Sequence, residues 1–353
     1  MNHKRYFHID FLRAVAIISV IVVHTLQYNL KDSLTRFIWN YSHFVVPALI
    51  FCSGYVLEKH QYSFDKLSRV FSWWKKRLIR LLLPFYLYLT FHFLLLIIFP
   101  AFFSGLGLIK SPAYIIKSAL LIGGIDANWL PLLFIEMTLL FPALKLIIKR
   151  PFILVFYILL ALFMTVFYTS RTASGISLYQ NYRLLMILPY SLIILLAMKV
   201  ADKETHRVNK KIYLIIVAVS TIILGLLLTV WQNLGNISLI VHKYPPGLYY
   251  LSYGLIISSL IILISTLKFF QQGIVNRFII FTSKESYTLF FVSFIVLDFV
   301  QNQREIYPVV NNVVIQLTMN IFISFFIVYL LQLVISICHT PLNKRENFFA
   351  DAD

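Results

Sequence analysis

The chain has 353 residues, of which 60% are hydrophobic and only 13% are charged, whereas an ordinary soluble protein carries about 25% charged residues. The composition excludes a soluble globular protein, and apolar runs of about 18 residues or more are long enough to cross a bilayer core of about 30 Å. The formal net charge of +17 does not indicate nucleic acid as a partner, because the basic residues stand in short links between apolar runs, where they hold loops in the cytoplasm.

The apolar runs predict an all-α, polytopic membrane protein with about ten transmembrane helices. We expect these helices at residues 10–28, 38–57, 81–99, 129–148, 152–169, 184–200, 212–231, 248–267, 278–300 and 313–337. A weaker run at 113–122 is too short to span and predicts a re-entrant or interfacial helix. With the amino terminus inside, the cytoplasmic links hold most of the Lys and Arg, so both termini are predicted to be cytoplasmic. Residues 1–342 form the predicted transmembrane domain, and 343–353 form a polar, disordered tail.

The first predicted helix carries Asp10, Arg13 and His24. Arg13 and His24 are eleven residues apart, which places them on nearly the same helix face, roughly 16 Å apart along the axis. Ionisable groups inside a membrane are costly and by default mark function. Arg13 is read either as an interfacial residue paired with Asp10 or as an anion-binding group. His24 is read either as a buried neutral imidazole bonded to a neighbouring helix or as a general base toward a hydroxyl group.

The basic run at residues 73–84 places Lys76, Arg77 and Arg80 where the third helix enters the membrane. Arg77 and Arg80 share a helix face because they are three positions apart. One interpretation is a topological anchor on the cytoplasmic side. The other is a phosphate clamp for a coenzyme A thioester, since guanidinium groups bind phosphate with a matching fork of donors.

Residues 128–142 combine Trp129 and Glu136 in an apolar helix. A carboxylate at the position of Glu136 needs a partner, and we expect His24 or a basic group to serve. Glu136 would then orient the histidine, whereas Trp129 fits either a substrate contact or an interfacial belt residue. Ser53, followed by a glycine in the second helix, indicates close packing that also lines a cavity.

Weaker signals complete the set of candidates. His43 and His92 are interpreted as satisfied structural histidines, and the loop with Tyr244 and two prolines as either a sugar-stacking platform or part of an aromatic belt. The sequence has no P-loop, zinc-ligand spacing, glycine-rich nucleotide fingerprint or serine nucleophile elbow. We therefore predict no metal site.

Four ordered segments resemble the acyltransferase 3 family of membrane-bound acyltransferases. The first is 9–24, with its Arg-x10-His pair at Arg13 and His24; the others are 47–57, with Ser-Gly, 75–88, with Arg-x-x-Arg, and 128–144, with Trp and Glu. The late Ser-Tyr pair is present at Ser286 and Tyr287, but Ser293 stands near the position where the family often has a histidine. In its overall size and its Tyr-Pro-Pro loop, the chain most resembles the subgroup near the polysaccharide intercellular adhesin membrane proteins of Gram-positive bacteria.

The resemblance implies a membrane O-acyltransferase that moves an acetyl or succinyl group from cytosolic acyl-CoA to a hydroxyl of a cell-surface polysaccharide or its precursor. It implies His24, Arg13 and Glu136 as catalytic residues. Arg77, Arg80 and Lys76 would bind the donor, and Trp129, Ser53 and Tyr287 the substrates. The expected partners are membrane lipids, acyl-CoA and the glycan, in a bacterial plasma membrane. Two other readings stay open: a translocase of a surface polysaccharide or lipid-linked sugar, and a structural partner of a synthase complex.

Overall fold

The computed structural model describes residues 5–103, 111–173, 182–204, 208–231 and 238–350. Within these ranges the chain has no strand, and its extended pairing is an isolated bridge between Lys243 and Pro246. Seven helices in the described part are long and apolar enough to cross a membrane, or eight if one bent pair counts as a single span. The all-α, polytopic prediction is confirmed, while the count of ten spans and the side of the termini stay predictions.

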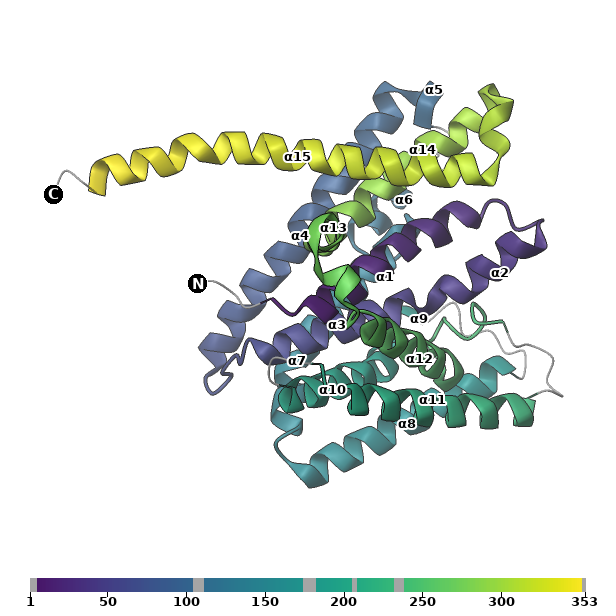
Figure 1. The fold of residues 1–353 in the computed structure, drawn as a ribbon, viewed down its shortest axis with the longest axis vertical. Helices are drawn as coiled ribbons and strands as arrows, with labels where there is room; N and C mark the ends of the chain where they lie inside the picture. Colours follow the sequence, from purple (N-terminus) through teal and green to yellow (C-terminus); the bar gives the residue numbers. More distant parts are fainter. Residues whose placement is uncertain (1–4, 104–110, 174–181, 205–207, 232–237, 351–353) are drawn as a thin grey trace.

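Figure 1 shows how the helices are arranged. In chain order they are α1 Phe7–Leu26, α2 Ser33–Tyr41, α3 Val45–Lys59, α4 Leu67–Ile98, α5 Pro100–Phe103, α6 Pro112–Ala119, α7 Trp129–Ile147, α8 Pro151–Ala173, α9 Tyr182–Leu185, α10 Ile187–Lys203, α11 Lys210–Trp231, α12 Leu248–Ile264, α13 Gly273–Lys284, α14 Ser286–Ile306 and α15 Val313–Ala350. The predicted short helix at 113–122 corresponds to α6, which is too short to span a membrane.

Helix α1 lies at the centre of the bundle. It packs against α3, α12, α13, α14 and α15, and its apolar side chains Leu12, Ala16 and Ile17 are buried. A helix that is apolar on most of its circumference is expected in the interior rather than at a surface. The polar residues of α1 are therefore held among other helices.

The Ser-Gly pair of α3 marks a close helix contact, as the sequence predicts. A Cβ atom added to Gly54 would lie 3.1 Å from the Cα atom of Ile194 and 3.1 Å from the Cβ atom of Ala197, both on α10. Small residues let two backbones approach this closely inside a membrane. This contact fixes the position of α3, which also packs on α1.

One predicted element boundary differs clearly from the structure. The sequence predicts a link before the third span, yet α4 begins at Leu67, so the basic residues from Arg69 onward are helical.

The predicted second span is present as the stretch Ser33–Lys59, which is long and apolar enough to cross a membrane. A 3₁₀ turn at 42–44 divides it into α2 and α3. The turn lies just before Pro47, which removes one backbone donor and crowds the preceding turn.

The predicted ninth helix is likewise two helices. α13 and α14 meet at Glu285 with a bend of 79°, and the Glu285 carboxylate accepts a hydrogen bond of 2.8 Å from the side chain of Gln332 on α15. A buried carboxylate needs such a partner, and the contact holds the bend in place.

The last helix, α15, continues to Ala350 and extends past the other helices (Figure 1). The predicted boundary between residues 342 and 343 therefore falls inside α15. The division into a transmembrane domain and a tail stays a prediction.

Candidate active site

Four basic side chains from three helices converge on one cavity, here called the cationic cavity. Its volume is about 350 Å³. The basic residues are Arg13 of α1, Arg77 and Arg80 of α4, and Lys284 of α13. Lys284 lies 3.7 Å from the carboxylate of Glu285, whereas the three arginines have no carboxylate among the described residues of the lining. Such a cavity is suited to a ligand with several negative charges, because guanidinium groups bind phosphate or carboxylate oxygens in pairs.

The remaining predicted residues of this cavity are also in place. Ser53 and Tyr287 line it, and each is bound to the backbone, with the Ser53 hydroxyl donating to the carbonyl of Leu49 at 3.0 Å and the Tyr287 hydroxyl donating to the carbonyl of Leu81 at 2.9 Å. Each hydroxyl oxygen keeps the capacity to accept a further bond. The structure therefore brings together five of the predicted site residues.

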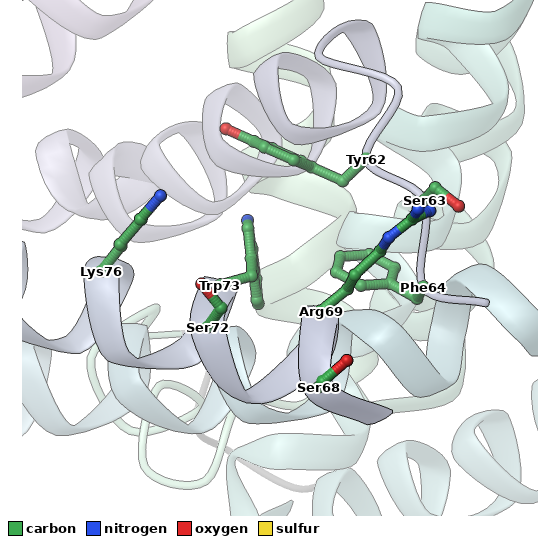
Figure 2. Close-up of a pocket in the computed structure, with 8 residues that line it drawn as sticks. All are labelled: Tyr62, Ser63, Phe64, Ser68, Arg69, Ser72, Trp73 and Lys76. Atoms are coloured by element: carbon green, nitrogen blue, oxygen red, sulfur yellow. The ribbon is translucent and has the colours of Figure 1, made fainter. Parts of the chain in front are cut away.

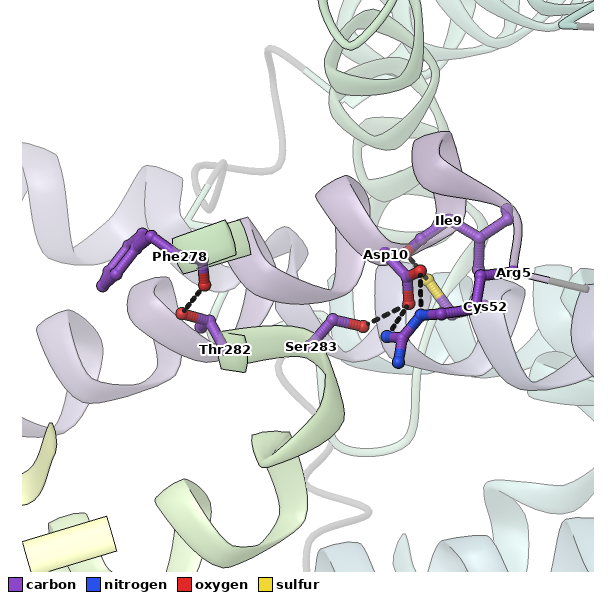
Figure 3. Close-up of polar contacts among 7 residues, drawn as sticks. All are labelled: Arg5, Ile9, Asp10, Cys52, Phe278, Thr282 and Ser283. Carbon is purple, nitrogen blue, oxygen red and sulfur yellow. Dashed lines mark hydrogen bonds and ion pairs between the residues drawn. The ribbon is translucent and has the colours of Figure 1, made fainter. Parts of the chain in front are cut away.

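Arg13 is not paired with Asp10, so that interpretation of its role is wrong. Figure 3 shows Asp10 held instead by Arg5 and Ser283. The Arg5 guanidinium donates two hydrogen bonds of 3.0 Å to the Asp10 carboxylate, and the Ser283 hydroxyl donates one of 2.6 Å. Asp10 is thus occupied by other donors, and Arg13 remains available to a ligand in the cationic cavity.

Arg77 carries the clearest sign of a missing ligand. Its Nε atom is buried and has no hydrogen-bond partner among the described residues. Buried donors in native proteins nearly always have a partner, so an orphaned one needs an explanation. A bound anion in the cationic cavity would supply it.

Lys76 lies outside the cationic cavity. Figure 2 shows it on a separate hollow of about 320 Å³ beside the amino-terminal part of α4. The hollow, here called the α4 hollow, is lined by Tyr62, Ser63, Phe64, Ser68, Arg69, Ser72, Trp73 and Lys76. The Arg69 guanidinium is paired with the Asp65 carboxylate at 2.8 Å. Lys76 is the other cation of this hollow, and it has no carboxylate partner in the described part of the chain.

His24 opens into a second cavity, here called the histidine cavity, of about 230 Å³. Its polar lining consists of His24, Gln27, Tyr28, Tyr88, His92, Tyr114, Asp126 and Asp298. Aromatic rings and carboxylates together are suited to a small polar ligand with hydroxyl groups. Arg13 and His24 therefore both face cavities, as their spacing predicts, but they face two different ones.

The same three helices line both cavities. α1 contributes Arg13 to one and His24 to the other, and α4 and α14 likewise contribute to both. On α14, Phe290 lines the cationic cavity and Phe294 the histidine cavity, with their ring centres 5.1 Å apart. The two cavities are therefore lined by neighbouring rings of one helix.

Trp129 is placed under a buried lysine. The Lys243 ammonium lies 5.2 Å from the centre of the Trp129 ring and 4.9 Å from that of Tyr244, an arrangement that stabilises a cation. Burial lowers the pKa of Lys243, in the loop before α12, to about 7. Trp129 is buried, and neither cavity includes it in its lining, so its predicted substrate contact stays a prediction.

The Tyr-Pro-Pro loop is an interior element. Pro245 and Pro246 are buried and Tyr244 is half-buried, with the Tyr244 ring set edge-on against Trp129 at 5.3 Å. Both interpretations of this loop, as a sugar platform or as a belt at the membrane surface, require exposed rings. The packing of Tyr244 supports neither of them.

Glu136 is half-buried on α7. Its Oε2 atom is buried without a hydrogen-bond partner among the described residues. The lining of the histidine cavity does not include it. The proposed orientation of His24 by Glu136 therefore stays a prediction.

Sequence reasoning missed Asp298 and took His92 for a structural residue. Both line the histidine cavity. The available signal was an aspartate within an apolar helix, which by default marks a functional site.

Ser293, at the position where a histidine is expected, is buried and donates to the carbonyl of Phe290 at 2.8 Å. His43 is a satisfied core residue, as predicted, with Nδ1 2.7 Å from the carbonyl oxygen of Trp39.

Within the described ranges, no group of three or more His, Cys, Asp or Glu residues is arranged to hold a metal ion.

In comparisons with known proteins, the family model of acyltransferase 3, described as an acyltransferase domain, matches residues 6–339. No curated protein and no solved structure matches the chain.

Proposed function

The chain belongs to the acyltransferase 3 family, and from this premise we propose that it transfers an acetyl or succinyl group from acyl-CoA to a hydroxyl of a cell-surface polysaccharide or its precursor. The observation that carries the proposal is the cationic cavity. Its three arginines come from two helices, and in the described part of the chain none of them forms an ion pair with a carboxylate. We place the protein in the plasma membrane of a bacterial cell, with the cationic cavity on the cytosolic side.

The donor would bind by its phosphates. Arg77 and Arg80 share one face of α4, and Arg13 faces the same cavity from α1. A diphosphate with several oxygens satisfies the orphaned Nε atom of Arg77 and engages the other two guanidinium groups. The α4 hollow, with Lys76 beside the rings of Tyr62 and Trp73, is suited to the nucleotide end of the same donor.

The acceptor would bind in the histidine cavity. The acyl end of the donor would extend along α1 from Arg13 toward His24, past the ring pair of Phe290 and Phe294. An imidazole of the histidine cavity then takes the proton of the acceptor hydroxyl as its oxygen attacks the thioester carbon. The sequence predicts His24 for this step.

The test uses the full chain in nanodiscs with [¹⁴C]acetyl-CoA or [¹⁴C]succinyl-CoA. The acceptor probe is the alkali-deacylated surface polysaccharide of the cell that encodes the chain. We expect label in the polysaccharide with the wild type and its loss with His24→Ala. The matched control is His43→Asn, a buried histidine that lines neither cavity.

One result would contradict the role of His24, and another would contradict the proposed activity. Preserved transfer by a folded His24→Ala would remove His24 from the mechanism. Movement of the polysaccharide across vesicles without any acyl donor, and without label transfer, would favour the translocase.

A further inference from the structure

The histidine cavity contains an ionisable pair in addition to His24. His92 of α4 and Asp298 of α14 both line it, and their side chains are buried, with exposed fractions of 8% and 2%. The Nδ1 atom of His92 lies 3.8 Å from the Oδ2 atom of Asp298. An imidazole and a carboxylate are both costly inside a membrane protein and are retained there chiefly for function.

The two ring nitrogens of His92 have different surroundings. Nδ1 faces the Asp298 carboxylate, whereas Nε2 is buried and has no hydrogen-bond partner in the described part of the chain. At 3.8 Å the carboxylate is beyond hydrogen-bond distance, but its negative charge still favours the tautomer that carries the proton on Nδ1. The lone pair of Nε2 is then free to accept a proton from a ligand in the cavity.

His24 lacks such support. Its ring centre lies 4.5 Å from that of Phe294, and its side-chain hydrogen bond is with Gln27. Among the described residues, no carboxylate forms an ion pair with it. A proton taken by His24 would create an unpaired buried cation, whereas one taken by His92 would lie beside Asp298, which lowers the cost of the charge.

We propose that His92 is the catalytic base toward the acceptor hydroxyl and that Asp298 is its positioning residue. This inference depends on the acyl transfer proposed above. The O–H bond of the acceptor breaks, its proton passes to Nε2 of His92, and the oxygen forms a bond with the acyl carbon. The C–S bond of the thioester then breaks, and the thiolate takes the proton back from the imidazolium. His24, which lines the same cavity, would then contact the acceptor rather than take its proton.

The test compares variants of the full chain in nanodiscs, with [¹⁴C]acetyl-CoA and the alkali-deacylated polysaccharide as probes. His92→Asn keeps an amide donor near the position of Nδ1 and removes the proton-accepting Nε2 atom. We expect kcat to fall by about 10²- to 10⁴-fold with KM for acetyl-CoA unchanged, the range for loss of a general base. Asp298→Asn should lower kcat in the same sense, by up to about 10⁴-fold, because it permits the wrong tautomer.

Chemical rescue separates a catalytic role from a structural one. Added 4-methylimidazole should restore transfer by His92→Gly, since the small base can occupy the vacated volume. The control His43→Asn, which keeps a donor toward the Trp39 carbonyl, should retain the wild-type kcat. Melting temperatures identify any variant that fails to fold, and His92→Gln, whose amide cannot accept the proton, then takes the place of His92→Asn.

The outcomes are distinct. A folded His92→Asn or His92→Gln with the wild-type kcat would overturn the role of His92 and leave the acyltransferase proposal intact, with His24 as the base. A wild-type protein that transfers no label would overturn the proposed function and this inference together.

Discussion

Replacement of Arg77 by glutamine tests the donor site most directly. The Nε atom of Arg77 is buried without a partner among the described residues, so the variant breaks no internal hydrogen bond of that atom and should fold normally. In the donor complex the guanidinium would bind a phosphate. A hydrogen bond to a charged group contributes about 1.5–3 kcal/mol, which corresponds to a rise in KM for acetyl-CoA of about 10- to 150-fold.

The assay compares acetyl-CoA with S-acetylpantetheine, which carries the same thioester but no phosphate. We expect Arg77→Gln to raise KM for acetyl-CoA and to leave KM for S-acetylpantetheine unchanged. The matched control is Arg150→Gln, an exposed arginine between α7 and α8. Equal losses with both donors, or no change with acetyl-CoA, would refute the assignment of phosphate binding to Arg77.

Three further predictions concern other parts of the site. Lys76→Gln in the α4 hollow should raise KM for acetyl-CoA by only about two- to fivefold, because an exposed charge is screened by water; an unchanged KM would remove this hollow from the donor site. Phe294→Ala should widen the proposed route of the acyl chain past Phe290 and Phe294. The rate of transfer of a longer acyl chain relative to acetyl should then rise by about fourfold per added methylene. Competition between acetyl-CoA and hexanoyl-CoA measures this ratio, and an unchanged ratio would contradict the prediction. Because burial lowers the pKa of Lys243 to about 7, the unfolded chain binds more protons than the folded one between that value and the ordinary lysine pKa of about 10.4. The contribution of Lys243 to stability should therefore rise from pH 7 to 10. In detergent, the melting temperature of the wild type should rise over this range relative to that of Lys243→Met. Melting temperatures of the two proteins that change in parallel with pH would contradict the lowered pKa of Lys243.

The amino-acid pattern alone predicts the architecture in outline. Apolar runs long enough to cross a bilayer predict helices because a membrane interior forces the backbone to satisfy its own hydrogen bonds. The spacing of Arg13 and His24 predicts one helix face, and both side chains do face cavities. These features depend on residues close together in one segment, where helix geometry alone fixes their relative positions.

Which groups lie together follows instead from the packing of the helices. Arg13 is available to a ligand because Asp10 is held by Arg5 and by Ser283 from the bend before α14, and no local rule predicts that choice. His92 and Asp298 lie on α4 and α14, far apart in the chain, so their pairing follows from helix packing and from the cost of burying a charge without a partner. Helical periodicity specifies which residues share a face, whereas packing specifies which faces meet.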